Sequence, residues 1–429
     1  MRIAFVVDQF PAVSETFVLN QITGLLDRGQ WVDIFARNIS QDCVVHEEIR
    51  RYDLAKRTYH LNSYMTTQNK LSRFGQRLTL LFRNFHKNPR AVLRSLDLLK
   101  WGKRALSLEV FSQIKPFLDK EPYDVLHCQF GPNGFLGLML RDVGLFQGKV
   151  ITSFLGHDIS AYPKAMGSNI YQNLFARGDL FLCVSKRVAD KLTALGCDSR
   201  KVVVHRLGIA TEKFHPGLLS AKQNRQPRVL TVARLVEKKG VEYGIKSVAK
   251  LTKNFPNLEY TIVGDGPLRP KLQELIDALD IAAKIRLIGS KTQGEIAGLL
   301  ETSDILLAPS VTAENGDEEG IPVAITEALA HGIPVVSTRH AGIPEVIDDG
   351  VSGFLLPERD IDGLAEKLGY LVSNPEIRSA MGLRGRRFID EYYDLEKLND
   401  RLVELYATPQ DNNYQSFPGN ASCQPIPSR

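Results

Sequence analysis

The chain has 429 residues, of which 43% are apolar, so it is long enough for two or three domains with cores of their own. Its 54 basic and 49 acidic residues leave an excess of five positive charges, which argues only weakly for an anionic partner. No apolar run approaches the roughly 18 residues of a membrane span, and the first run ends at Asp8, too early for a signal peptide. Five scattered cysteines without a Cys-x-x-Cys pair are typical of reduced thiols and predict a cytoplasmic protein.

The first half of the chain predicts a parallel α/β domain. Its predicted strands are the apolar runs at 3–7, 31–36, 124–129, 150–154, 179–184 and 201–205. A helix from about 15 to 28, with Ser14 as its N-cap, follows the first strand. The loop before this helix lacks the Gly-x-Gly-x-x-Gly fingerprint of a phosphate site. Residues 11–15, including Ser14, are therefore expected to face a ligand in its place.

Residues 70–115 form a basic segment, in which eleven lysines and arginines are opposed only by Asp97 and Glu109. Apolar residues three and four apart predict one or two amphipathic basic helices here. Such a face can rest on an anionic membrane or meet an anionic acceptor, and it can equally be the solvated face of a helix packed on the domain. Nucleic acid is not expected as a partner, because no nucleic-acid-binding motif accompanies the charge.

One predicted strand ends in a histidine. The strand at 150–154 runs into Leu155-Gly156-His157-Asp158. Beside a glycine and an acid, His157 is placed to orient a substrate hydroxyl, although an ordinary loop histidine with satisfied hydrogen bonds has the same surroundings.

The second half of the chain predicts another parallel α/β domain. A stretch rich in Pro, Gly and polar residues at 216–227 is the expected linker. The predicted strands, at 228–233, 258–263, 285–288, 305–308, 335–337 and 353–356, alternate with helical stretches. The sequence thus predicts two doubly wound domains, 1–215 and 228–379, that face each other across a cleft, and a disordered tail at 408–429.

The stretch after the strand at 305–308 predicts an anion site. Gly320 supplies a turn and Pro322 suits the first helical position, so a helix should begin near Ile321. Its free N–H groups would lie at the carboxyl end of a strand, where phosphates bind. Glu319 in the loop and Glu327 on the second helical turn could then face one ligand, although acids also favour any helix start.

Two cations follow the first strand of the second domain. Arg234 and Lys239 lie in its loop and are expected to project into the cleft. Pre-aimed at a departing diphosphate, each would stabilise the transition state by roughly 3 kcal/mol, whereas ordinary surface charges contribute almost nothing. Gly264 and Asp265 end the next strand in a turn and are a weaker candidate.

A metal is not expected at this site. The Asp-x-Asp pattern at 360–362 opens a predicted helix and is read as a helix cap. No histidine or cysteine cluster has the spacing of metal ligands. The predicted site therefore needs no metal or other cofactor.

Together these residues resemble the retaining glycosyltransferases of family 4, which have the GT-B fold of two Rossmann-like domains. The resemblance rests on Glu319 and Glu327 with seven residues between them, Arg234…Lys239-Gly240, the Gly-Asp-Gly-Pro at 264–267, His157-Asp158 and the Tyr-Tyr-Asp at 392–394. More narrowly, residues 14–17, His127…Gly131 and 317–322 resemble the bacterial exopolysaccharide branch, as in colanic acid and amylovoran assembly.

The resemblance implies transfer of a sugar from a nucleotide diphosphate donor to a hydroxyl of a saccharide or lipid-linked saccharide, with retention. The resemblance implies that the donor diphosphate is bound by Arg234, by Lys239 and by the backbone at Ile321, Pro322 and Val323. It further implies that Glu319 and His157 bind hydroxyls of the donor sugar and that Glu327 binds the ribose. The leaving phosphate oxygen would take the acceptor's proton, so no separate base is needed. Helices at 380–407 would cross back to brace the first domain.

Other functions fit the same fold less well. A sugar-nucleotide epimerase or hydrolase would need a further acid/base pair, which the sequence does not reveal. A non-catalytic nucleotide-sugar sensor would be favoured if a key cation or glutamate were missing. The sequence has both cations, Arg234 and Lys239, and both glutamates, Glu319 and Glu327. An interaction module based on residues 70–115 would explain only a small part of the chain.

Overall fold

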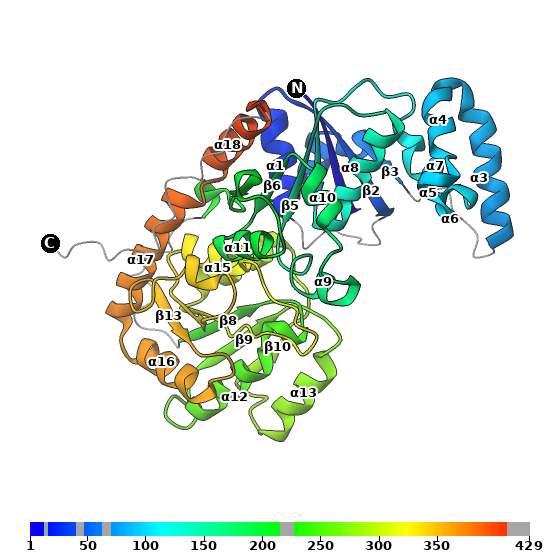
Figure 1. The fold of residues 1–429 in the computed structure, drawn as a ribbon. Coiled ribbons are helices and arrows are strands. Elements are labelled where there is room, and N and C mark those ends of the chain that lie inside the picture. The colour runs from blue at the N-terminus through cyan, green and yellow to red at the C-terminus, as the bar shows by residue number, and fades with distance from the viewer. Residues whose placement is uncertain (13–15, 40–46, 62–69, 215–226, 410–429) are drawn as a thin grey trace.

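The computed structural model describes residues 1–12, 16–39, 47–61, 70–214 and 227–409. These residues fold into two parallel α/β domains (Figure 1). Ser14, most of the predicted linker at 216–227 and nearly all of the predicted tail lie outside them.

The first domain contains a seven-stranded parallel sheet in the order β3-β2-β1-β4-β5-β6-β7. Its strands are β1 Arg2–Phe10, β2 Trp31–Ile39, β3 Thr58–His60, β4 Val125–Gln129, β5 Lys149–Phe154, β6 Leu180–Cys183 and β7 Val202–Val204. Its helices, apart from the basic segment, are α1 Thr16–Asp27, α2 Glu47–Arg51, α8 Gly131–Val143, α9 Ala161–Met166, α10 Gln172–Arg177 and α11 Lys186–Ala194. Alternate residues of β1 face opposite cores, because Phe5 packs with α1 whereas Val6 packs with α8.

The second domain contains a six-stranded parallel sheet in the order β10-β9-β8-β11-β12-β13. Its strands are β8 Arg228–Val232, β9 Glu259–Val263, β10 Ile285–Leu287, β11 Ile305–Ala308, β12 Val335–Thr338 and β13 Gly353–Leu356. Its helices are α12 Val241–Leu251, α13 Arg269–Ala278, α14 Gln293–Thr302, α15 Val323–Ala330, α16 Ile361–Ser373 and α17 Pro375–Tyr392. In each sheet the strand order reverses beside the domain's first strand, which opens a crevice at the strands' carboxyl ends. The predicted fold class of two doubly wound domains is confirmed.

The last helix, α18 (Leu395–Ala407), packs against α1 of the first domain. Arg28 of α1 pairs with Glu396 at 2.9 Å and with Asp400 at 2.7 Å. Deeper in the core, the Tyr406 hydroxyl lies 2.6 Å from Nδ1 of His127 on β4. The chain therefore leaves the second domain through α17, and its last described helix, α18, packs against the first domain (Figure 1).

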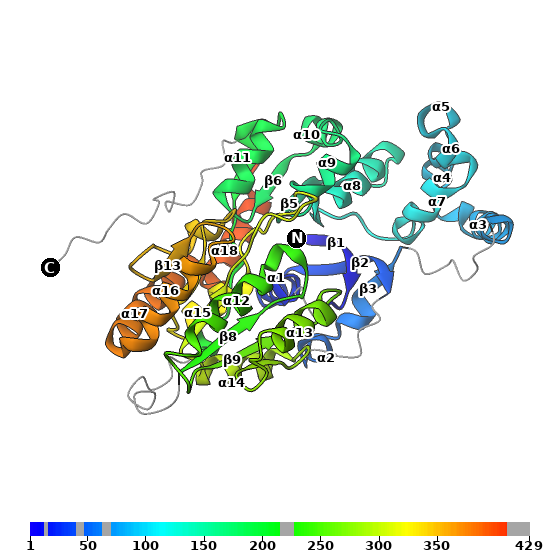
Figure 2. The ribbon, with the colours of Figure 1, turned by 90° about the horizontal axis from the view of Figure 1, so that it is seen from below.

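The basic segment differs from its prediction. It forms five short helices rather than one or two: α3 Lys70–Asn84, α4 Pro89–Ser95, α5 Leu98–Trp101, α6 Lys103–Leu106 and α7 Glu109–Ile114. New helices begin where Asn88 and Asp97 cap α4 and α5 with their side chains, and Gly102, with φ of 50°, separates α5 from α6. Seen from below, α3, α4, α5 and α6 form an arm that projects away from both sheets (Figure 2).

Across the ranges that the structure describes, no helix is both long enough and apolar enough to pass through a bilayer.

Candidate active site

The two domains touch where the loop after β11 meets the loop after β5. A side chain on Gly320 would place its Cβ only 2.0 Å from the carbonyl oxygen of Leu155, in the opposite domain. Gly320 does not have a positive φ. The bend at Gly320 therefore does not require a glycine, and glycine is needed here because the two backbones approach closely.

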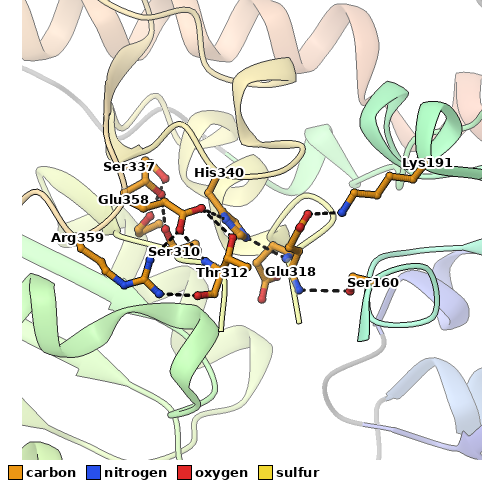
Figure 3. A network of polar contacts seen from close by, with 12 residues as sticks. Ser160, Lys191, Ser310, Thr312, Glu318, Ser337, His340, Glu358 and Arg359 are labelled. Carbon is orange, nitrogen blue, oxygen red and sulfur yellow. Dashed lines mark hydrogen bonds and ion pairs between the residues drawn. The ribbon is translucent and has the colours of Figure 1, made fainter. Parts of the chain in front are cut away.

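Charged groups reinforce this contact between the domains. Lys191 of α11 pairs with Glu318, whose N–H donates to the Ser160 hydroxyl at 3.3 Å (Figure 3). On the other side, the carboxylate of Glu345 accepts the N–H groups of Lys186 and Arg187 at 2.7 and 2.8 Å. A carboxylate of the second domain thus lies at the N-terminus of α11, where negative charge is favourable.

Glu319 lies at the centre of a charged cluster. Its carboxylate is 3.0 Å from Nζ of Lys239 and 3.5 Å from Nζ of Lys238. Although burial alone would raise the pKa of Glu319, the two lysines outweigh it and hold the pKa below its usual value. One carboxylate oxygen, Oε1, is buried, lies 3.5 Å from Nζ of Lys238 and makes no hydrogen bond within the described part of the chain, so its capacity to accept a hydrogen bond is not filled.

Lys238 was missed by sequence reasoning. It is 8% exposed and pairs with Asp317 at 3.1 Å as well as with Glu319. The signal was present as two consecutive lysines before Gly240, but the sequence does not show which of them is buried.

His157 reaches the same cluster from the first domain. Its Nδ1 lies 3.3 Å from Asp317, and this contact raises the pKa of His157. Burial alone would raise the pKa of Asp317, but His157 and Lys238 bring it down to about 2. The loop that carries His157 is fixed by Asp158, whose buried carboxylate accepts the N–H groups of Gly131 and Gly156 at 3.0 and 2.9 Å.

The loop after β8 presents its two predicted cations differently. Lys239 is largely buried against Glu319, whereas Arg234 is exposed and forms no ion pair with any described residue. Gly240, with φ of 60°, lets this loop approach β11, because a Cβ here would lie 1.9 Å from the carbonyl oxygen of Pro309. Arg234 is therefore the cation that is free to meet a ligand without breaking an existing pair.

Gly264 and Asp265 shape this loop through their backbones. A Cβ on Gly264 would lie 1.9 Å from the carbonyl oxygen of Ala233, and Leu235 N–H donates to the Asp265 carbonyl at 2.9 Å. The two residues therefore bracket Arg234, and the Asp265 side chain points to solvent with a weak contact to Arg269 at 3.6 Å.

Helix α15 begins two residues later than predicted. It starts at Val323, and Pro322 is its N-cap with ψ of 124° rather than its first helical residue. The free N–H groups at this helix start therefore belong to Val323 and Ala324. Of the backbone groups predicted at 321–323, Val323 lies at the helix start, whereas Ile321 precedes the helix and Pro322 has no N–H.

Glu327, on the second turn of α15, lies on the other side of this helix start. It lines an interdomain cavity of about 380 Å³ and is 9% exposed. The other lining residues come from four places: Thr16, Phe17, Leu19 and Asn20 of α1, Glu47 and Glu48 of α2, Leu207–Ala210 with Phe214, and Thr292, Gln293, Gly294, Ala297 and Val323 around α14 and α15. Burial raises the pKa of Glu327 to about 7, although a hydrogen bond from Gln293 lowers the pKa in part.

The predicted pair of glutamates thus has the expected placement, one in a loop and one on a helix, but Glu319 does not line the cavity that Glu327 lines. Lys239 shares a small pocket at the carboxyl ends of β8 and β11 with Ser310, Pro322 and Ala324. Glu327 lines the larger cavity, and Val323 at the helix start belongs to it too. An elongated ligand laid across the start of α15 would reach both spaces.

Sequence reasoning also missed His340, which lies behind the Glu319 loop (Figure 3). It is 1% exposed and accepts the Glu319 N–H on Nε2 at 3.1 Å. Its Nδ1 lies 2.6 Å from the carboxylate of Glu358. The rule that singled out His157, a histidine just beyond the carboxyl end of a strand, applies to His340 after β12 as well.

No group of three metal-ligating side chains is present among the residues that the structure describes. The Asp-x-Asp pattern is a helix cap, as predicted, because Asp360 accepts the Gly363 N–H at 2.8 Å at the start of α16.

Comparisons with known proteins cover nearly the whole chain. The family model "Glycosyltransferase Family 4" matches residues 14–213, and "Glycosyl transferases group 1" matches residues 219–388. The amylovoran biosynthesis glycosyltransferase AmsK of Erwinia amylovora is 39% identical over 369 residues, which cover 85% of this chain and 89% of AmsK. WcaL of Escherichia coli K12, named as a colanic acid biosynthesis glycosyltransferase, is 34% identical and covers 94% of this chain and 99% of its own.

Two solved structures show the same fold. A glycosyltransferase from Rickettsia africae matches with a TM-score of 0.67 at 19% identity, over 94% of this chain and 97% of its own. HepE of Anabaena, solved with UDP and glucose, matches with a TM-score of 0.68 at 16% identity, over 95% and 99%.

Proposed function

The chain belongs to the family 4 glycosyltransferases, and on that premise we propose that it transfers a sugar from a nucleotide diphosphate donor to an acceptor hydroxyl, with retention, in exopolysaccharide biosynthesis. The observation that supports this most directly is the Glu319 cluster. It combines a buried carboxylate, one oxygen of which makes no hydrogen bond in the described part of the chain, with two lysines and a histidine from the facing domain.

The donor diphosphate would lie between the loop after β8 and the start of α15. Arg234 and Lys239 supply positive charge there, and Val323 and Ala324 supply free N–H groups. In the structure Lys239 pairs with Glu319, so a diphosphate would share this lysine with the carboxylate. The charge that grows on the leaving phosphate would then meet fixed cations rather than water.

The sugar and the nucleoside of the donor would extend to either side of the diphosphate. The sugar would face Glu319, whose Oε1 makes no hydrogen bond in the described part of the chain, and His157 of the first domain. The nucleoside would enter the cavity beside α14, where the Glu327 carboxylate can accept the ribose hydroxyls. UDP is bound in the solved HepE of Anabaena, which has the same fold.

In the proposed reaction the acceptor hydroxyl attacks the anomeric carbon from the face that the diphosphate leaves. The bond from the anomeric carbon to the phosphate oxygen breaks, and that oxygen takes the acceptor's proton. Lys239 and Arg234 stabilise the departing diphosphate, and no further protein base is required. We propose that no metal takes part, because these fixed groups can neutralise the diphosphate.

The experiment that tests this function is thermal stabilisation by UDP, GDP, ADP and their sugars, with and without EDTA. Ligands that bind only the folded state raise its melting temperature, so the donor is identified without knowledge of the acceptor. We expect one nucleotide to give a metal-independent shift that is lost in Lys239→Ala and kept in Lys253→Ala, an exposed lysine on the same domain. No shift with any nucleotide would instead favour a function outside sugar transfer.

We further propose that the arm formed by α3–α6 rests on an anionic membrane that holds a lipid-linked acceptor. Eight large apolar side chains are exposed on it: Phe74, Leu78, Phe82, Phe85, Leu93, Leu98, Leu99 and Leu106. Phe74, Leu78 and Phe82 recur every four residues and so share one face of α3, and Phe85 follows directly after the end of this helix. The exposed cations Arg83, Arg90, Arg94 and Lys103 have no ion-pair partner in the described part of the chain.

Apolar side chains beside unpaired cations match the interface of an anionic bilayer, where each cation contributes about 1 kcal/mol. We therefore expect the protein to sediment with vesicles that contain phosphatidylglycerol and not with neutral phosphatidylcholine vesicles. Phe82→Glu with Arg83→Glu should abolish sedimentation, whereas Leu383→Glu, at an exposed leucine of α17, should leave it unchanged. Equal sedimentation of both variants would mean that the arm is a solvated surface.

A further inference from the structure

The loop that carries Glu319 is held by a hydrogen-bond chain behind the site. The Glu319 N–H donates to Nε2 of His340 at 3.1 Å, and Nδ1 of His340 faces the Glu358 carboxylate at 2.6 Å (Figure 3). A second bond runs from the Gly342 N–H to the Gly320 carbonyl at 3.2 Å. The backbone before α15 is thus fastened to the segment after β12.

This chain of contacts defines one state of the His340 ring. Because Nε2 accepts a hydrogen from Glu319, it carries no proton of its own, and the ring proton is on Nδ1. Glu358 accepts that proton with the same oxygen that the Thr312 hydroxyl approaches at 3.1 Å. Its other oxygen accepts the Thr312 N–H at 2.8 Å and Arg359 at 3.2 Å. All the groups around Glu358 are donors, so only a carboxylate satisfies them.

His340 does not contact substrate itself, because it is 1% exposed and lies under the loop. Its ring instead sets where the Glu319 backbone lies. The Glu319 side chain starts from that backbone and reaches Lys239 and Lys238 across a short distance. A shift of this backbone would move the carboxylate out of reach of a donor sugar.

We propose that His340, with its tautomer fixed by Glu358, is a positioning residue that holds Glu319 and the start of α15 in the geometry needed for donor binding and transfer. This inference rests on the proposed function, since the role of Glu319 toward a donor is part of that proposal. Neither His340 nor Glu358 was among the residues that the sequence singled out.

The isosteric variant Glu358→Gln tests the tautomer directly. Its amide oxygen must remain beside Thr312 N–H and Arg359, which both donate, so its NH₂ group must face His340. The histidine proton would then move to Nε2 and point at the Glu319 N–H, donor against donor. A substitution that changes no shape should therefore displace the loop.

Binding of UDP, GDP and ADP and the kinetics of transfer give the functional measurement. We expect Glu358→Gln to weaken nucleotide-sugar binding about tenfold and to lower kcat as well, as expected when a buried donor loses its acceptor. The matched control Glu366→Gln, at an exposed carboxylate of α16, should behave like the wild type. Unchanged KM and kcat in a folded Glu358→Gln variant would overturn the proposal.

Two further variants distinguish positioning from general stability. The terminal amide of His340→Gln reaches the place of Nε2 and can accept the Glu319 N–H, whereas the shorter His340→Asn cannot. We expect His340→Gln to retain more donor affinity than His340→Asn at similar melting temperatures. Equal losses would contradict the proposal, and this pair also decides it if Glu358→Gln fails to fold.

Histidine-selective ¹⁵N NMR separates this inference from the proposed function. The signal of His340, identified by its absence from His340→Gln, should show a proton on Nδ1 in the wild type and on Nε2 in Glu358→Gln. A wild-type protein with its proton on Nε2 would overturn the inference even if transfer is observed. If the wild type binds no nucleotide at all, the proposed function fails, and the NMR result still decides the tautomer.

Discussion

The two glutamates on either side of the start of α15 have opposite environments. Glu319 pairs with two lysines, which hold its pKa below the usual value, whereas Glu327 forms no ion pair with any described residue and burial raises its pKa to about 7. Both carboxylates are about nine-tenths buried. The difference shows that one helix start can separate a space suited to charged ligand groups from one suited to a neutral, hydroxyl-rich group.

The largest effect is expected on the charged side. We expect Glu319→Ala and Lys239→Ala each to lower kcat by roughly 10²–10³, the usual cost of losing one pre-organised group in the transition state. Steady-state kinetics with the donor found by thermal stabilisation would measure this. Full activity in both variants would show that the charged cluster has only a structural role. The difference in charge between the surroundings of Glu319 and Glu327 would then have no bearing on transfer.

The other side of the comparison predicts a pH-dependent change in stability. Below about pH 4.5, the usual pKa of Glu327, its carboxyl is protonated in the folded and unfolded states, so Glu327→Gln should change little. As pH rises to about 7, only the unfolded chain ionises, and the wild type loses stability relative to the variant. Because one pKa unit corresponds to about 1.4 kcal/mol, the variant should be more stable by up to about 3 kcal/mol above pH 7.

Urea unfolding of Glu327→Gln and the wild type at pH 4.5 and pH 8.5 would measure this difference. Glu301→Gln, at an exposed position of α14, is the control for a simple change in net charge. A variant that is no more stable at pH 8.5 would mean that Glu327 is as well solvated as Glu301 and that the two sides of α15 do not differ in polarity.

A smaller effect is expected for the exposed cation of the charged side. Arg234→Ala should raise the KM for the donor about tenfold, the size of one lost hydrogen bond to a charged group. It should leave the melting temperature unchanged, because Arg234 forms no ion pair with the described residues, whereas Lys239→Ala breaks a pair with Glu319. Arg286→Ala, an exposed arginine on the edge strand β10, is the control. An unchanged KM would mean that Arg234 does not act on the donor and that the charged side acts through Lys239 and Lys238.

The sequence was informative where local chemistry decides the structure and weak where distant segments meet. Apolar runs between turns predicted every strand except β3, whose residues Thr58–His60 are only half-buried at the sheet edge. Glu319 and Lys239 could be placed together because both follow the carboxyl ends of strands that pair in a parallel sheet. The burial of Lys238 and the bond from Glu319 to His340 depend on packing between loops far apart in the chain, which no local pattern reveals.

Removal of metal ions is expected to have no effect on activity. The proposed site neutralises the diphosphate with Arg234, Lys239 and the N–H groups at Val323 and Ala324, the task that a divalent cation performs in other sites. Transfer should therefore proceed equally with EDTA and with Mg²⁺, and loss of activity that Mg²⁺ restores would contradict this. The same assay on Lys239→Ala sharpens the comparison between the two sides of α15. Mg²⁺ should restore part of the transfer activity of Lys239→Ala and none of that of Glu327→Gln. This result would show that the site needs positive charge beside Glu319 and not beside Glu327.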